Sequence, residues 1–425
     1  MITGQRNIGN LSVFLFAFLI FGFPIQSFIP FILSVDSTPI NVSFRILFVV
    51  IAIIITGASF EKKSNNLINL GWFAFILFWI FYGSRLIYDL EIKNLLFLEK
   101  NKEYVYSFAF GVCLIPSIAI YYSAKYIDST RLLILIFTII LISNLCITYA
   151  ILTTGKWNIT EIVLSRANVN VEINGETKSI INPITIGFFG EIITILSMHI
   201  LNFNLISDKK YFRVGLYFCI GLGILNLVFG ASRGPMVSLV ILALIEFYFV
   251  AKKRSFNKTF IVKILFWITA TVSVISYELL SKVNKEDIEL LNRLSVTAEY
   301  RENDQKEERD YLYQSAWNQF LDSPIIGDSY LTKYPYPSYS HNLFLDVLMS
   351  TGIIGAILFG IIGYSISVSI KHNLNNAPNA GVTKLYILLY IGILLISMTS
   401  GGLFTSAELW IFSAFMLSLN NHANN

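Results

Sequence analysis

The stretch RLLILIFTIILISNLCITYAIL, residues 131–152, decides the fold class of this chain. It opens with one charge, Arg131, and is then predominantly apolar for about the 20 residues that a helix needs to cross a bilayer. Further stretches of this kind lie at about 11–33, 43–60, 67–88, 104–124, 181–205, 212–230, 233–250, 259–279, 343–370, 384–400 and 402–420. The sequence therefore predicts an all-α polytopic membrane protein with about twelve transmembrane helices, folded as a single membrane domain over residues 1–425.

The composition excludes the soluble classes of protein. Hydrophobic residues make up 55% of the chain and charged residues only 14%, whereas charged residues are about 25% of an ordinary soluble domain. So few charges cannot cover a soluble surface, which excludes a cytosolic enzyme, a nucleic-acid-binding domain and a disordered chain. The first apolar run has no small-residue cleavage site after it and is interpreted as a retained span. Pro24 and Pro30 predict a kink in that span.

Charge sets the predicted orientation in the membrane. Alternate short loops are rich in Lys and Arg and the others in Asp and Glu, so the positive-inside rule places both termini in the cytoplasm. Two outer loops are long, 153–180 and 280–342. In the second loop, apolar residues recur at helical spacing from Leu312 to Phe320, which predicts an amphipathic helix that ends before Pro324.

Three polar residues at the predicted outer boundary are candidates for chemistry. His341 opens the tenth span, where a histidine can act as a base or a donor near neutral pH, or can simply cap the helix. Arg233 follows a tight turn at the start of the eighth span, where a guanidinium beside a helix start suits a phosphate. Its alternative role is a snorkelling anchor. Arg309 lies on the outer-loop helix among acidic neighbours, so its alternative is a surface ion pair.

Other residues are further candidates for substrate contacts. Arg166 lies in the first long outer loop, where a solvated loop charge is the alternative. Tyr334, Tyr336 and Tyr339 belong to an aromatic-proline loop whose flat rings suit sugars, or else form a membrane-interface belt. Glu408 lies inside the last span, where a carboxylate is costly and marks a functional candidate by default. Its alternative role is to pair with a buried arginine.

Several familiar signatures are absent from the sequence. It contains no P-loop, no His-Glu-x-x-His and no Asp-x-Asp pair in an outer loop. We therefore expect no metal and no cofactor. The three cysteines lie inside apolar runs and are interpreted as packing residues. Arg45, Arg85 and Glu191 lie in or near spans, and the sequence assigns them no role.

Taken together, these elements resemble the O-antigen ligase/polymerase superfamily. The resemblance rests on Arg309 followed by seven residues and Trp317, on Pro324-Ile-Ile-Gly327, and on His341-Asn342 followed by nine residues and Gly352-Ile-Ile-Gly355. The turn Ser232-Arg233-Gly234 and the segment Asn182-Pro-Ile-Thr-Ile-Gly187, which follows Arg166, also fit the pattern. The core of the resemblance covers about 230–360.

The resemblance implies a GT-C-like glycosyltransferase of the bacterial inner membrane, with its active site on the periplasmic side and no metal. Donor and acceptor would be glycans on undecaprenyl pyrophosphate. Arg233 and Arg309 would neutralise the pyrophosphate, and His341 would activate or orient the acceptor hydroxyl. The implied substrate-binding residues are Arg166, Asn342, Tyr334, Tyr336, Tyr339 and Glu408.

Three functions fit these residues. An O-antigen polymerase would join lipid-linked repeat units, whereas an O-antigen ligase would move the finished chain onto lipid A–core. The polymerase is favoured because a composition rich in Ile, Phe and Asn is typical of AT-rich surface-polysaccharide clusters. A transporter or flippase also fits twelve spans, but the polar candidates gather on the outer side and no repeated half is visible. Membrane lipids and a chain-length regulator are further expected partners, and no nucleic acid is expected.

Overall fold

The computed structural model describes residues 2–60, 70–155, 157, 167–173, 176–253, 308–376 and 380–419. The ninth predicted span, at 259–279, and the candidate Arg166 lie outside the described residues. Contacts between residues divide the chain into two units. Unit 1 holds Met1–Cys146 and Lys306–Asn425, and unit 2 holds Ile147–Gln305.

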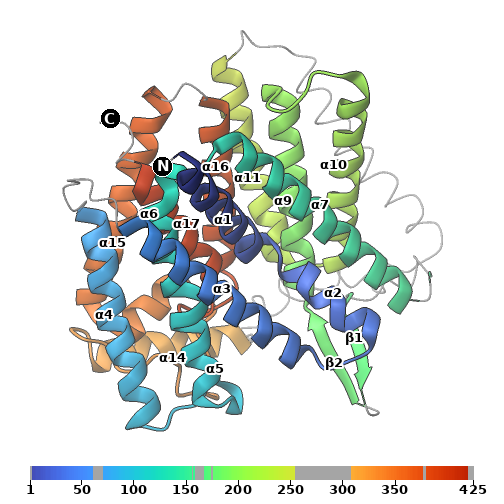
Figure 1. The fold of residues 1–425 in the computed structure, drawn as a ribbon. Coiled ribbons are helices and arrows are strands. Elements are labelled where there is room, and N and C mark those ends of the chain that lie inside the picture. The colour runs from blue at the N-terminus through green and yellow to red at the C-terminus, as the bar shows by residue number, and fades with distance from the viewer. Residues whose placement is uncertain are drawn as a thin grey trace. The chain divides into compact units, whose positions relative to one another are not determined.

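Unit 1 is a bundle of helices (Figure 1). Its helices are α1 (Ile2–Phe21), α2 (Phe23–Leu33), α3 (Ser37–Phe60), α4 (Leu70–Glu91), α5 (Lys102–Tyr106), α6 (Ile115–Ser123), the first part of α7 (Ser129–Thr154), α14 (Glu308–Asp322), α15 (Leu343–Asn376), α16 (Ala380–Ser397) and α17 (Ala407–Ser418). Three short helical turns complete the unit, namely η1 (Phe97–Glu99), η2 (Ser107–Leu114) and η3 (Ala124–Tyr126). The turn η2 is π-helical and joins α5 to α6, so that Lys102–Tyr126 is one apolar span.

Among the described residues, unit 2 holds the last part of α7, three long helices and one hairpin. Its elements are β1 (Val169–Ile173), β2 (Glu176–Ile181), α9 (Pro183–Phe203), α10 (Lys210–Gly230) and α11 (Arg233–Lys253). The strands are antiparallel, so the polar loop predicted at 153–180 contains a hairpin that the sequence analysis did not predict. Helices α9 and α10 pack backbone to backbone, because a β-carbon on Gly190 would lie 2.4 Å from the carbonyl oxygen of Gly223.

The described residues hold nine or ten candidate spans, against the predicted twelve. Nine described helices are long and apolar enough to cross a membrane, and α1 with α2 makes a tenth if the bent pair is one span. The predicted span at 259–279 lies outside the described residues, and the one at 402–420 is α17, only 12 residues long. Every residue of α17 except Glu408 is buried, so this helix packs inside unit 1 and does not need the length of a lipid-facing span.

The first span is bent, as its prolines predict. Helices α1 and α2 are bent by 67° relative to each other. The break lies at Gly22, just before Pro24, because proline offers no N–H to the preceding turn and its ring clashes with the carbonyl four residues earlier. Pro24 then lies in the first turn of α2, and Pro30 lies inside α2. Only the first proline therefore coincides with the kink.

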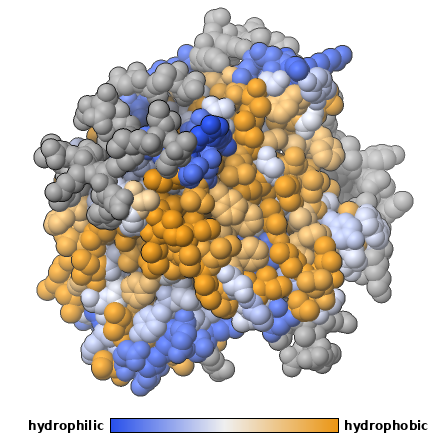
Figure 2. All heavy atoms as spheres, viewed as in Figure 1, coloured by the Kyte–Doolittle hydropathy of each residue, from blue (hydrophilic) through white to orange (hydrophobic). Residues whose placement is uncertain are grey.

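The outward side of α3 is apolar, as a bilayer-spanning helix requires. Ile46, Ile53 and Ile54 are 60%, 58% and 55% exposed. Figure 2 shows apolar side chains over α1 and α3, with hydrophilic ones toward the lower edge near the ends of α4 and α5. An apolar surface of this extent is unfavourable in water and matches lipid tails. The protein is therefore a multi-pass membrane protein.

Candidate functional site

A close backbone contact at two glycines anchors the segment between α14 and α15. Gly327 and Gly352 both have positive φ, 74° and 61°. A β-carbon on Gly352 would lie 2.5 Å from the carbonyl carbon of Ile325, and one on Gly327 would lie 2.4 Å from that of Ser350. Only glycine combines this backbone conformation with this approach. The glycines of the Pro-x-x-Gly and Gly-x-x-Gly patterns therefore serve packing at this junction.

Backbone hydrogen bonds complete the junction. The N–H of Ile353 donates to the carbonyl oxygen of Pro324 at 2.8 Å, and the N–H of Asp328 donates to that of Met349 at 2.8 Å. These bonds form because α15 is broken at Gly352, where ψ is −157°. Residues 328–351, a loop followed by the first turns of α15, consequently form a segment whose two ends are joined by main chain.

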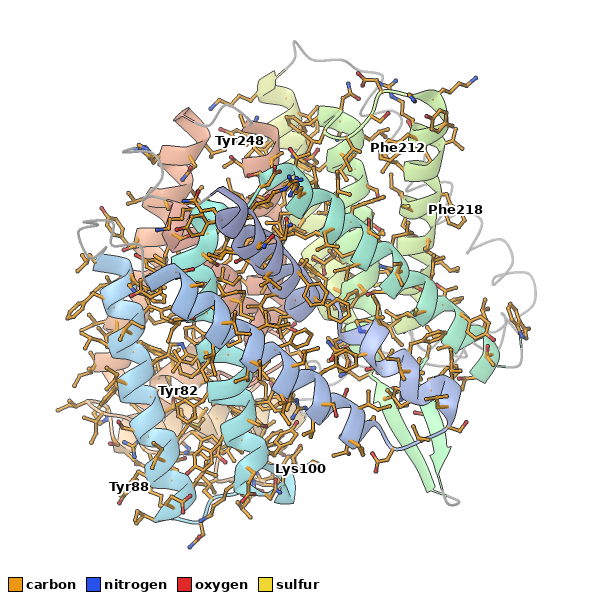
Figure 3. The ribbon with its side chains drawn as sticks, in the orientation of Figure 1. Tyr82, Tyr88, Lys100, Phe212, Phe218 and Tyr248 are labelled. Atoms are coloured by element: carbon orange, nitrogen blue, oxygen red, sulfur yellow. The ribbon has the colours of Figure 1, made fainter. Side chains whose placement is uncertain are left out.

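A charged cluster on α4 holds the same segment. The Arg85 guanidinium donates to the carbonyl oxygens of residues 326–328 at 2.8–3.2 Å. The Lys93 ammonium lies 3.2 Å from Asp89 Oδ1 and 3.6 Å from Asp328 Oδ1. The sequence assigned no role to Arg85. In the structure, Arg85 holds the start of the loop through the backbone carbonyl groups of residues 326–328. Figure 3 labels Tyr88 on the same helix end.

Asp328 is the acidic centre of this cluster. Burial alone would raise the pKa of Asp328, but its ion pairs with Lys333 and Lys93 outweigh burial and lower that pKa. The carboxylate is therefore ionised at neutral pH and links the loop to α4.

The aromatic-proline loop presents exposed rings on a fixed base. Tyr334 and Tyr336 are 63% and 37% exposed. Gln319 of α14 holds the base of the loop, because its Nε2 donates to the Leu331 carbonyl at 3.1 Å and its Oε1 accepts the Lys333 N–H at 2.8 Å. Exposed tyrosine faces on an ordered base suit stacking against sugar rings.

Tyr339 contacts one catalytic candidate of unit 1, His341, and is acted on electrostatically by the other, Arg309. Its ring stacks on Phe97, with centroids 5.3 Å apart, and meets the His341 ring edge-on, with centroids 4.5 Å apart. Burial raises the pKa of Tyr339 to about 12; the Arg309 guanidinium acts on it in the opposite direction. The side chains of Arg309 and His341 therefore both lie close enough to interact with Tyr339.

His341 is held in an unusual backbone conformation. Its φ is +60°, a left-handed value that costs a non-glycine residue about 1 kcal/mol or more. The cap of α15 is the next residue, Asn342, whose Oδ1 accepts two N–H groups of the first turn at 3.1 and 3.2 Å. The helix-capping role considered for His341 thus belongs to Asn342. Strain of this kind concentrates at functional sites.

Asp346 fixes the backbone beside His341. This side chain is 2% exposed, and its Oδ1 accepts the Ser340 N–H at 2.8 Å. The backbone of Leu403, in the turn that precedes α17, also interacts with it. The buried Tyr82 of α4, labelled in Figure 3, lies within electrostatic reach of it. Sequence reasoning missed Asp346, although an acidic residue inside a predicted span was a usable signal.

Glu408 lies in the first turn of α17 and is half-buried. It follows the turn that contains Leu403, and it lies within electrostatic reach of Cys113. Its role in substrate binding stays a prediction.

Arg233 is the first residue of α11 in unit 2 and is half-buried. The turn before it is tight, because Ala231 has a φ of +40° and a β-carbon on Gly230 would lie 2.7 Å from the Pro183 carbonyl oxygen. Pro183 begins α9, whose N-cap is Asn182. The starts of α9 and α11 therefore lie at one end of unit 2, and helix starts favour an anion.

The interface of α9 with α11 carries buried carboxylates. Glu191 accepts the Ser238 hydroxyl at 2.6 Å, and Glu246 lies 2.6 Å from His199 Nδ1. Asn202 Nδ2 donates to the same Glu246 at 2.7 Å. Sequence reasoning named only Glu191 of these residues. Each pair joins one residue of α9 to one of α11, so these contacts fix the two helices side by side.

The structure thus brings together some of the predicted site residues. Arg309, His341 and Tyr339 gather in unit 1, with Asn342 capping the next helix and Tyr336 acting electrostatically on Tyr339. Arg233 belongs to unit 2.

The comparisons with known proteins address one part of the chain. No curated protein matches it. Residues 218–360 match the family model described as O-antigen ligase. This range includes the start of α11 with Arg233, helix α14 with Arg309, and the loop that carries His341. Over residues 218–360, the chain carries an O-antigen ligase family domain.

Proposed function

We propose that this protein is an O-antigen polymerase: a metal-independent membrane glycosyltransferase, GT-C-like in fold, which joins repeat units carried on undecaprenyl pyrophosphate. The observation that carries the proposal is the contact of His341 with Tyr339, on which the charge of Arg309 also acts, inside the residues that match the family. A cation and a histidine around one partly enclosed position are what transfer from a pyrophosphate leaving group requires.

The reaction assigns each of these side chains a task. The acceptor hydroxyl oxygen forms a bond to the anomeric carbon of the donor sugar, and the bond from that carbon to the pyrophosphate oxygen breaks. The bonding electrons leave with the pyrophosphate, whose added charge Arg309 and Arg233 would stabilise. His341 would accept the proton of the acceptor hydroxyl, since histidine titrates near neutral pH. Arg166, Asn342 and Glu408 would contact substrate.

The high pKa of Tyr339 supports this division of roles. A phenol with a pKa of about 12 keeps its proton at neutral pH, so Tyr339 would donate a hydrogen bond and not serve as the base. The tyrosines at the tip of the loop, Tyr334 and Tyr336, would stack on the glycan.

The second candidate is an O-antigen ligase, which would transfer finished polymer to lipid A–core. The description of the matching family model favours it. The two candidates differ in the acceptor and share the donor, the leaving group and the proposed residues. In both cases the reaction would take place at the periplasmic face of the inner membrane, with both termini in the cytoplasm and a chain-length regulator as a further partner.

Lipopolysaccharide gels test both candidates. A strain lacking the gene is complemented with wild type, His341→Asn or His341→Ala. Asparagine tolerates positive φ better than other non-glycine residues, so His341→Asn removes the base with the least damage to the loop. For a polymerase, the deletion strain and both variants show core carrying a single repeat unit. For a ligase, they show bare core, with long polymer on the carrier lipid. A normal ladder from His341→Asn would overturn the role of His341, and a normal ladder from the deletion strain would overturn both functions.

A further inference from the structure

Arg45 is a charged residue on a helix that faces lipid. It lies in α3, whose neighbouring side chains Val42, Ile46 and Leu47 are 42%, 60% and 47% exposed. A guanidinium in such a segment costs free energy unless it is paired or reaches the interface, so it marks a functional site by default.

The contacts of Arg45 leave most of its hydrogen-bonding capacity for another group. Its Nη1 lies 3.5 Å from Ser107 Oγ, at the limit of a hydrogen bond. Its guanidinium carbon lies 3.8 Å from the centroid of the Phe108 ring and 5.6 Å from that of Tyr104. Within the described part of the chain, no carboxylate forms an ion pair with it. Two aromatic faces thus hold a planar fork of five N–H donors, a geometry that matches phosphate oxygens.

Arg45 lies near the outer end of its span. It is eight residues after Ser37, which begins α3, and so about 12 Å along the helix axis at 1.5 Å per residue. Under the predicted topology Ser37 is on the outer side. An arginine side chain reaches several ångströms along its apolar stem toward the interface. The guanidinium is therefore within reach of the level of lipid phosphates.

Tyr104 connects Arg45 with the candidate site. Arg45 lies over the Tyr104 ring, and the Tyr104 hydroxyl acts electrostatically on Tyr339. Tyr339 in turn contacts His341. All of these residues belong to unit 1. Lys100, just before α5, adds a positive charge at this end of the unit (Figure 3).

We propose that Arg45, with Ser107 and the ring of Tyr104, is a binding site for the phosphate groups of a polyprenyl pyrophosphate that reaches the site from the bilayer along α3 and α5. The identity of this lipid rests on the proposed function. The phosphate chemistry is shared with phospholipid headgroups and with free pyrophosphate, so the test separates these sources.

The test is lipid binding to the purified full-length protein in phosphatidylcholine nanodiscs. Undecaprenyl pyrophosphate is titrated into wild type, Arg45→Gln, Arg45→Lys and the control Arg131→Gln. Arg131 is an exposed arginine on α7 that donates to Asn10 Oδ1 at 2.9 Å. We expect Arg45→Gln to weaken binding at least tenfold, Arg45→Lys to weaken it less, and Arg131→Gln to leave it unchanged. Equal affinity of wild type and Arg45→Gln would overturn the proposal.

Competition identifies the source of the phosphate. We expect inorganic pyrophosphate at millimolar concentration to displace the polyprenyl lipid, and 20-fold excess phosphatidylglycerol not to displace it. Displacement by phosphatidylglycerol would show a general anionic-lipid site and would overturn the assignment. The melting temperature of each variant in detergent checks folding. If Arg45→Gln melts early, the comparison of Arg45→Lys with wild type decides, because lysine keeps the charge and loses the planar fork.

Gels of complemented strains separate this inference from the proposed function. If His341→Asn abolishes the ladder while Arg45→Gln gives a normal one, the inference fails and the proposed function stands. If the deletion strain keeps a normal ladder, the proposed function fails, and nanodisc binding still decides whether Arg45 holds a phosphate.

Discussion

At the scale of single residues, substitutions of Asn342 can distinguish its role in capping α15 from its proposed role in substrate binding. Its Oδ1 caps α15, and loss of a cap costs about 1 kcal/mol. Asn342→Asp keeps the capping oxygen and removes the amide N–H₂ group. We expect Asn342→Ala to lower the melting temperature by a few degrees and Asn342→Asp to restore it. Polysaccharide formation by Asn342→Asp then shows whether the amide group contacts substrate. Normal activity of this variant would show that Asn342 is not a substrate-binding residue.

Asp346 is the residue on which the position of His341 depends most. It accepts the backbone N–H of Ser340, and a buried donor left unpaired costs about 1–3 kcal/mol. We expect Asp346→Ala to lower the free energy of unfolding by about 2 kcal/mol or more. Asp346→Asn, which keeps one acceptor oxygen, should lose less. Denaturant unfolding in detergent measures both values, and equal stability of all three proteins would refute this role.

Asp328 gives the α4 cluster a dependence on pH. Its pKa is lower in the folded protein than in the unfolded chain. It therefore contributes stability that is fully present above the unfolded pKa of about 4 and is lost as pH falls through the folded value. We expect Asp328→Asn to melt earlier than wild type at pH 7, with the difference shrinking below about pH 4. The exposed Asp322→Asn is the control, and a pH-independent difference would contradict the assignment.

The sequence predicted residue identities better than residue roles. His341 and Arg309 stood out because a histidine and an arginine occupy the predicted outer boundary. His341 contacts Tyr339, and the charge of Arg309 acts on it. Asp346 was missed because its partners, Ser340 and Leu403, are backbone groups brought near only by folding. A backbone N–H leaves no signature in the residue types of a sequence.

At the scale of elements, the contact between the two glycines holds α15 to the segment that follows α14. A methyl group on Gly327 or Gly352 would overlap backbone atoms, and both residues have positive φ. We expect Gly327→Ala and Gly352→Ala each to destabilise the protein by more than about 2 kcal/mol. Gly360→Ala is the matched control in the same helix, because a methyl group there would meet no other atom within 4 Å.

That control should be neutral or slightly stabilising, since alanine is the better helix former. Melting temperatures in detergent provide the comparison. If Gly352→Ala melted with Gly360→Ala, the junction would not be a structural requirement.

Elements were predicted well where hydropathy alone determines them. The spans at 43–60, 67–88 and 131–152 correspond to α3, α4 and α7. The short α17 was predicted as a span, because hydropathy cannot distinguish a helix enclosed by protein from one that faces lipid. The β1–β2 hairpin was missed because short strands in a polar loop carry too few apolar positions to show alternation.

At the scale of the whole molecule, the orientation of the chain is a prediction that thiol labelling can check. Cys113 and Cys219 are buried and Cys146 is half-buried, so the native cysteines give a low background. Tyr334 is 63% exposed, and the Asp208 side chain is 75% exposed. We expect an impermeant maleimide to label Tyr334→Cys in intact spheroplasts and Asp208→Cys only after lysis. The reverse pattern would place the His341 loop in the cytoplasm.

The closed loop between Gly327 and Gly352 also bears on how such proteins diversify. Its two ends are joined by main-chain contacts, so changes of exposed side chains such as Tyr334 leave these contacts in place. Tyr334 and Tyr336 form the exposed rim of this loop, and His341 follows them in the chain. Evolution can therefore change the residues of the rim, and with them the glycan that the protein prefers, while His341 is kept. A loop exchanged between two such chains at the glycines would carry its sugar preference with it.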